Sequence, residues 1–112
     1  ARLSALFMVA AAGLTGLSAK NAWKIFKRDR YNHASPNSAQ TEAAMAGALG
    51  VQLAGDAYYF GTLYKKKTIG DALRPVECED IRRANRLMYA SAGLLLTVVM
   101  LLYVSFNILT LL

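Results

Sequence analysis

Cysteine and histidine are almost absent from this chain, and their scarcity excludes several kinds of site. Cys78 is the one cysteine, so the chain can form neither an intrachain disulfide nor a CxxC motif. His33 is the one histidine, which excludes a metal site with several histidines and a His-based catalytic triad with a plausible nucleophile. The nucleotide-phosphate signatures GxxxxGK[ST] and GxGxxG are also missing.

Charged side chains are missing from two long apolar stretches. Residues 3–19 and 87–112 contain no Lys, Arg, Asp, Glu or His. Of the 112 residues 55% are hydrophobic, and the mean hydropathy of +0.29 is high for a soluble domain of this size. A helix needs roughly 17–25 residues to cross a hydrocarbon core of about 30 Å. Both stretches are therefore predicted to be transmembrane helices.

The positive charge lies between these two stretches. The net charge is +6, and 12 of the 13 Lys and Arg residues fall between Lys20 and Arg86. By the positive-inside rule the connector is cytoplasmic, which predicts a multi-pass protein of the cell (inner) membrane. A secretory signal peptide is disfavoured because its positive charge precedes the apolar stretch, whereas here it follows. Because membrane topology already explains the basic residues, we expect membrane lipid as a partner and do not expect nucleic acid.

The residue pattern predicts three regions in an all-α integral membrane fold. Residues 1–30 form an uninterrupted transmembrane helix with a basic amphipathic exit. Residues 31–78 form a motif-rich connector with a short Ala- and Gly-rich helix over 38–53 and ordered loop or short strand pairs after it. Residues 79–112 form one helix of about 50 Å that starts with acidic residues and ends as the second span.

Gly13 and Gly16 allow two interpretations of the first apolar stretch. They could give one helix face small enough for another helix to approach, or reflect the general tolerance of glycine in membrane helices. The sequence leaves both open.

Four carboxylates are candidates for metal or phosphate chemistry: Glu42, Asp56, Asp71 and Asp80. Magnesium binds through one or two carboxylates together with substrate phosphates. Capping of a helix N-terminus is the simpler explanation of Glu42 and Asp80, and their spacing favours it. A structural or interfacial role is likewise favoured for His33, and contact with anionic lipid for the lysines at 65–67.

Six short motifs follow one another through the connector. They are His33-Ala-Ser-Pro-Asn37, residues 42–50, Tyr58-Tyr-Phe-Gly61, Ile69-Gly-Asp71, Leu73-Arg-Pro75 and Asp80-Ile-Arg82. In this order they resemble the CobD/CbiB family, the adenosylcobinamide-phosphate synthases of cobalamin biosynthesis. The resemblance runs from the first predicted span to the end of the chain. It departs from the family where Cys78 replaces a common Pro, and near Gln40 and Thr41, where a Trp or Pro is common.

The resemblance implies an enzyme that joins the carboxyl of adenosylcobyric acid to the amine of an aminopropanol phosphate in an ATP-dependent ligation. ATP and Mg²⁺ are the implied cofactors, and the corrinoid and aminopropanol phosphate are the implied substrates. Such a reaction needs cations, a metal-binding carboxylate and a base for the attacking amine. Family members are considerably longer, so the chain is expected to be the C-terminal portion and to work with a missing N-terminal portion.

The resemblance also gives the motif residues their expected roles. The catalytic residues would be His33, Glu42 and Asp71, of which Glu42 and Asp71 would also bind metal. Substrate would be bound by Asn37, Tyr58, Tyr59, Arg74, Asp80 and Arg82. The alternative is a non-catalytic membrane subunit that binds a corrinoid or docks a partner enzyme. A purely structural hairpin would explain the spans but not the ordered polar motifs.

The orientation can be tested with a cysteine in place of Lys66, after replacement of Cys78 by Ser. We expect an impermeant thiol reagent to label Lys66→Cys only from the cytoplasmic face, because the basic connector stays inside. Labelling of intact cells from the opposite face would overturn the predicted topology.

Overall fold

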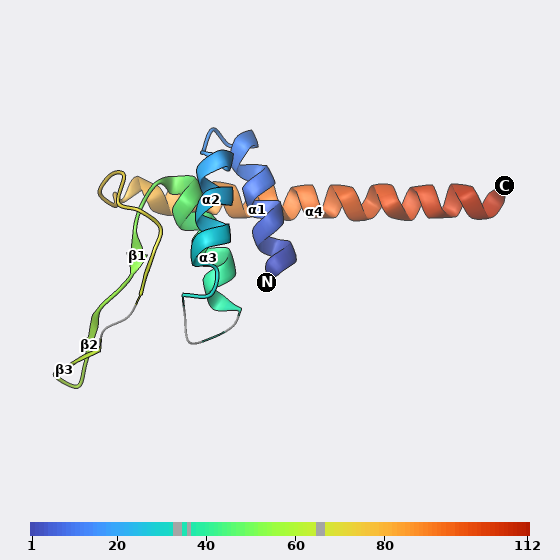
Figure 1. Cartoon of the computed structure of the whole chain (residues 1–112). Helices are drawn as coiled ribbons and strands as arrows, with labels where there is room; N and C mark the ends of the chain where they lie inside the picture. The colour runs from blue at the N-terminus through green and yellow to red at the C-terminus, as the bar shows by residue number, and fades with distance from the viewer. Residues whose placement is uncertain (33–34, 36, 65–66) are drawn as a thin grey trace.

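The computed structural model describes residues 1–32, 35, 37–64 and 67–112. Figure 1 shows a group of three short helices and two small strand pairs beside one long helix. The elements are α1 (Arg2–Leu14), α2 (Ala19–Asp29), α3 (Ser38–Leu49), β1 (Leu53–Ala54), β2 (Ala57–Tyr59), β3 (Thr62–Tyr64), β4 (Thr68–Ile69) and α4 (Glu79–Leu111). The described part is thus mainly helical, as expected. The all-α class leaves out the two strand pairs, which the sequence predicts only as one of two alternatives, ordered loop or short strand pairs.

A tight turn separates α1 from α2. Gly16 has φ +76°, in the left-handed region, and the N–H of Leu17 donates to the carbonyl of Ala12 at 2.9 Å, the pattern of a Schellman helix end. Ser18 then caps α2, because its hydroxyl accepts a hydrogen bond from the N–H of Asn21 at 3.1 Å. The predicted uninterrupted helix is therefore wrong, and Gly16 is a helix terminator.

The turn leaves α1 too short to cross a bilayer. Its 13 residues extend about 20 Å, against about 30 Å of hydrocarbon. Among the described residues, α4 alone is long and apolar enough to be a membrane span. The structure therefore does not support the predicted first span over residues 3–19.

Helices α2 and α3 approach each other closely at a glycine. A Cβ placed on Gly47 would lie 2.7 Å from both Cα of Ala22 and the carbonyl oxygen of Asn21, so only glycine fits. The Asn21 side-chain amide donates to the Gly47 carbonyl at 2.7 Å. Buried alanines on all three short helices fill the space around this crossing.

Helix α3 ends four residues before the predicted limit at residue 53. Gly50 has φ +71° and its N–H donates to the carbonyls of Ala46 and Gly47, which closes the last turn. The chain then forms β1, which pairs antiparallel with β4, and the β2–β3 hairpin. The expectation of ordered loop or short strand pairs here is confirmed.

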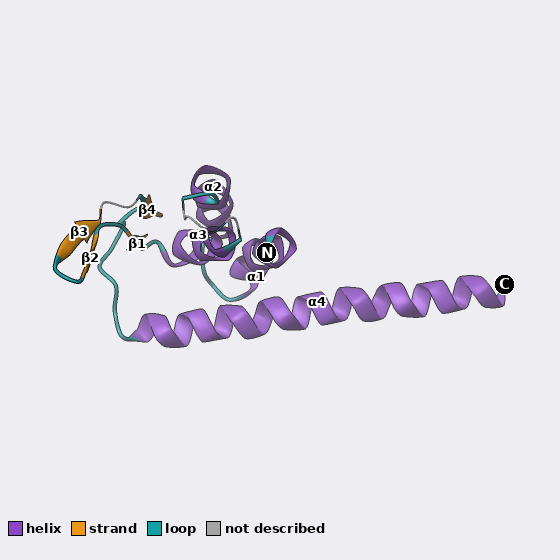
Figure 2. Ribbon diagram, turned by 90° about the horizontal axis from the view of Figure 1, so that it is seen from below, coloured by secondary structure: helices purple, strands orange, loops and turns teal. Residues whose placement is uncertain are grey.

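Helix α4 is continuous over 33 residues, about 50 Å, as predicted. Asp80 lies in its first turn, and its carboxylate accepts a hydrogen bond at 2.8 Å from the N–H of Glu77, which precedes the N-cap residue Cys78. Helices α1 and α3 contact α4, in which Leu87 and Ser91 are buried. Beyond them the apolar residues 96–112 project alone, as Figure 2 shows.

The close crossing of α2 and α3 gives a stability prediction. We expect Gly47→Ala to lower the free energy of unfolding by about 1–3 kcal/mol, because the new methyl group collides with backbone atoms of α2. Thermal unfolding of the full-length protein in detergent measures this. Gly93→Ala is the matched control, since nothing lies within 4 Å of its Cβ position. Equal stability of the two variants would contradict the packing described.

Candidate functional site

A buried carboxylate joins α2 to the loop after β4. Asp29 is only 4% exposed, and its oxygens accept hydrogen bonds from Arg28 at 2.9 and 2.8 Å. They also accept one from the Gly70 N–H at 2.7 Å and one from the Asn32 amide at 3.2 Å. These interactions satisfy a charge that would otherwise be costly to bury. We call Arg28, Asp29, Asn32, Gly70 and Asp71 the Asp29 cluster.

Arg28 brings Asp71 into the same cluster. Its Nη1 donates to Oδ2 of Asp71 at 3.0 Å, and its Nη2 lies 2.9 Å from Oδ1. The hydrogen-bonded guanidinium lowers the pKa of Asp71 and of Asp29, and the Gly70 and Asn32 hydrogen bonds act in the same direction on Asp29. One arginine therefore bridges two carboxylates, one buried and one partly exposed.

A second cluster holds the start of α4, and we call Arg74, Glu77, Asp80 and Arg83 the Asp80 cluster. Asp80 is 5% exposed and pairs with both terminal nitrogens of Arg74, one of them at 3.0 Å, and with Arg83 at 3.1 Å. Nε of Arg74 donates to the Leu49 carbonyl at 3.1 Å. Hydrogen bonds from Arg74, the Glu77 N–H and Arg83 hold the pKa of Asp80 well below its usual range.

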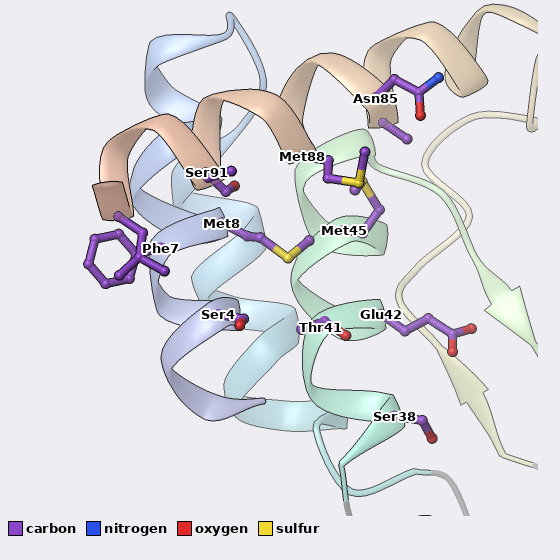
Figure 3. A pocket seen from close by; sticks show the side chains of 13 residues that line it. Ser4, Phe7, Met8, Ser38, Thr41, Glu42, Met45, Asn85, Met88 and Ser91 are labelled. Carbon is purple, nitrogen blue, oxygen red and sulfur yellow. The ribbon is translucent and has the colours of Figure 1, made fainter. Parts of the chain in front are cut away.

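A cavity of about 640 Å³ lies between α1, α3 and α4. In Figure 3 the side chains of Met8, Met45 and Met88 gather at its centre, and Glu42 lies at one side. Its polar lining comes from Ser4, Ser38, Thr41, Glu42, Asn85 and Ser91. A mainly apolar cavity with a few polar groups is typical of a site for an organic ligand.

The structure distributes the predicted site residues over several places. Glu42 lines the cavity, Asp71 belongs to the Asp29 cluster, and Arg74 and Asp80 belong to the Asp80 cluster. The exposed positions are Asn37 before α3, Tyr58 on β2 and Arg82 on α4, with Arg82 3.9 Å from Glu79. His33 and the side chain of Tyr59 lie outside the described residues.

The predicted metal ligands do not form a ready magnesium site in the described part of the chain. No three His, Cys, Asp or Glu side chains there are grouped as metal ligands. Both oxygens of Asp71 face the Arg28 guanidinium, so a cation would have to displace it. The donor set at Asp71 therefore suits an ion pair better than Mg²⁺.

Helix capping explains one of the two carboxylates for which it was expected. The prediction is confirmed for Asp80, which accepts from the Glu77 N–H. It is wrong for Glu42, which lies beyond the first turn of α3 and lines one edge of the cavity.

Sequence reasoning missed Asp29, the most buried charged residue in the described part of the chain. A signal was available, because Ala22, Ile25, Phe26 and Asp29 follow helical spacing on one face. An acid on the buried face of a short helix needs a partner, and Arg28 beside it is one.

Three comparisons connect the chain with known proteins. Residues 1–88 match the family described as CobD/Cbib protein. The chain is 52% identical to "Cobalamin biosynthesis protein CobD" of Clostridium perfringens over 88 residues, which are 79% of this chain and 28% of that protein. It is 52% identical to "Cobalamin biosynthesis protein CbiB" of Salmonella arizonae over 96 residues, 86% of this chain and 30% of that protein. The chain thus spans less than a third of these relatives, and no solved structure matches it.

The Asp29 cluster predicts a pH-dependent contribution to stability. We expect Asp29→Asn to lower the free energy of unfolding at neutral pH by about 1–3 kcal/mol, because charged hydrogen bonds to a buried group are lost. The pKa of Asp29 is lowered on folding from its ordinary 3.8, so this stabilisation is present above that value and is lost as the pH falls below it.

Denaturant unfolding of both proteins across acidic pH is the measurement. The wild type should lose more stability on acidification than Asp29→Asn, so that the two curves converge at low pH. Glu79→Gln is the control, since Glu79 is exposed and its nearest cationic partner is 3.9 Å away. Curves that stay parallel throughout would refute this role of Asp29.

Proposed function

The chain belongs to the CobD/Cbib protein family, and on that premise we propose that it is part of a membrane enzyme of cobalamin biosynthesis. The observation that carries the proposal is the 52% identity to relatives named for this pathway, over 79% to 86% of the chain. Helix α4 supports a membrane location, because it is long and apolar enough to span. The proposed setting is the inner membrane of the cell, multi-pass, with the connector in the cytoplasm.

The proposed reaction is the ATP-dependent joining of adenosylcobyric acid to aminopropanol phosphate through an amide bond. Activation of a carboxyl group by ATP places phosphate next to the acyl carbon, so cationic side chains and a base are needed nearby. The described arginines near the connector supply positive charge. Arg82 is exposed and lies 3.9 Å from its carboxylate partner Glu79, so its guanidinium can approach a phosphate group.

The structure favours Glu42 among the proposed catalytic residues. It lines the cavity between α1, α3 and α4, whereas Asp71 and Asp80 lie outside that lining, in the Asp29 and Asp80 clusters. We assign Asp71, Arg74 and Asp80 roles in positioning the connector around substrate. His33, Asn37, Tyr58, Tyr59 and Arg82 stay in the proposal as substrate-facing residues. Mg²⁺ would then be held through the phosphates of ATP, with Glu42 as the proposed carboxylate ligand at the cavity.

One observation favours a second candidate function. Two of the three carboxylates proposed for the site are in ion pairs, and the chain covers less than a third of its relatives. A non-catalytic role, in which this part binds a corrinoid or docks a partner enzyme, fits such an arrangement. The two candidates differ in whether Glu42 is needed for turnover or only for binding.

Turnover in membranes that contain the full-length protein tests the proposal. We expect Glu42→Gln to reduce amide formation from adenosylcobyric acid, ATP and aminopropanol phosphate by about 100-fold, the usual scale of a lost acid–base or ligand group. Corrinoid binding by the same membranes should persist, since the cavity keeps its shape. Glu79→Gln, an exposed carboxylate at the start of α4, should retain full turnover.

The alternatives give different results in this assay. Loss of corrinoid binding together with turnover in Glu42→Gln would favour the binding role. Undiminished turnover after replacement of His33, Asp71 and Arg74 together would overturn the assignment of the site residues.

A further inference from the structure

Helices α1, α2 and α3 run across α4 rather than along it. In Figure 1 they stand transverse to the long helix, and the view in Figure 2, turned by 90°, looks nearly down their axes. If α4 crosses a bilayer upright, the three short helices lie parallel to the membrane plane. This follows from the two views together and does not depend on the proposed reaction.

The outer face of α1 is apolar. Leu3, Leu6 and Leu14 are 59%, 38% and 73% exposed and follow helical spacing together with exposed Ala10. The opposite face buries alanines against the other helices. An exposed apolar stripe of this kind is unfavourable in water and suits a hydrocarbon boundary.

The outer face of α2 is basic and carries a tryptophan. Lys20, Trp23, Lys24 and Lys27 are exposed and lie on neighbouring turns, and Nζ of Lys27 is 5.1 Å from the centre of the Trp23 ring. The only acid of α2, Asp29, is buried and paired with Arg28. The exposed face therefore carries only positive charge, beside an aromatic ring of the kind enriched at headgroup level.

The three helices also sit at a suitable level along α4. Helices α1 and α3 contact α4, which buries Leu87 and Ser91 where the uncharged run begins, and α2 packs on α1 and α3. Both views place α1 nearer the C-terminal end of α4 than the strands. The bare segment over residues 96–112 is about 25 Å long, close to the hydrocarbon thickness. A layer at this level coincides with the membrane–water interface.

We propose that α1, α2 and α3 form a layer that lies flat in the membrane interface, with the basic face of α2 bound to anionic phospholipid headgroups. Charge complementarity selects the bilayer surface as the occupant, because the exposed face of α2 has three lysines and no acid. The apolar face of α1 meets the upper acyl chains. The break at Gly16 is what allows a 13-residue apolar helix to turn into the plane.

Spin-label depth measurements in the full-length protein test the layer. Single cysteines replace Leu3, Leu6 and Leu14 on α1, and Leu96 and Leu109 on α4, in a cysteine-free background reconstituted in phosphatidylglycerol–phosphatidylcholine vesicles. We expect equal depths for the α1 labels, whereas the two α4 labels differ by about 20 Å. Depths at Leu3 and Leu14 that differ by about 16 Å would show an upright α1 and overturn the proposal.

If the α1 labels were inaccessible to both oxygen and a water-soluble nickel chelate, the proposal would also be overturned, since another part of the protein would then cover that face.

The preference of α2 for anionic lipid is tested by a separate measurement. Energy transfer from a fluorophore at Lys20→Cys to labelled phosphatidylglycerol should exceed that to labelled phosphatidylcholine. In a Lys24→Gln, Lys27→Gln background this preference should be lost, while Arg82→Gln leaves it unchanged. Equal transfer to both lipids without these changes would refute anionic headgroup binding.

Discussion

Two residues between α1 and α2 determine how the N-terminal half of the chain packs: Gly16, which has a left-handed backbone conformation, and Ser18, which caps α2. Because Gly16 closes α1 and Ser18 opens α2, the chain reverses within a few residues and lays α2 against both α1 and α3. The crossing of α2 over Gly47 then fixes the end of α2, and with it Asp29, next to the loop after β4. A single long helix in place of this turn would carry Asp29 away from Gly70 and leave the connector without its anchor.

The connector is held at two points by buried carboxylates. Asp29 ties its middle to α2, and Asp80 ties its end to α4 and, through Arg74, to the last turn of α3. Each carboxylate is satisfied by several donors, which offsets the cost of its burial. Asp71, Arg74 and Asp80, which come from three of the sequence motifs, thus hold the connector in place. Substitution of Asp71 or Arg74 would therefore disturb the shape of the connector as well as any contact with substrate.

Length and charge were enough to predict α4 and its acidic start, because these depend on local sequence. Alternating glycines and aromatics indicated ordered loop or short strand pairs in the connector, and strand pairs are what formed. The break at residues 15–18 also had a local signal, Thr-Gly-Leu-Ser, which combines a C-terminal glycine with an N-cap serine. Because the stretch carries no charge, Gly16 is more readily interpreted as a glycine within a membrane helix than as the end of a helix. The burial of Asp29 and the cavity around Glu42 could not be predicted, since they join segments far apart in sequence whose packing no local pattern specifies.

The cavity lies beside the proposed interfacial layer of α1, α2 and α3, because α1 and α3 line it. The cavity lies between α1, α3 and α4 and is lined by α4 residues from Ala84 to Leu95, the part of α4 that enters the proposed membrane. A ligand there would meet methionine and phenylalanine side chains on the side of α1, and Ser38, Thr41 and Glu42 on α3. Such a cavity favours a substrate with a large apolar surface and one polar reacting group, since the former can rest at the membrane boundary while the latter reaches α3. Placement of the reacting group beside Glu42 then requires no movement of either carboxylate cluster.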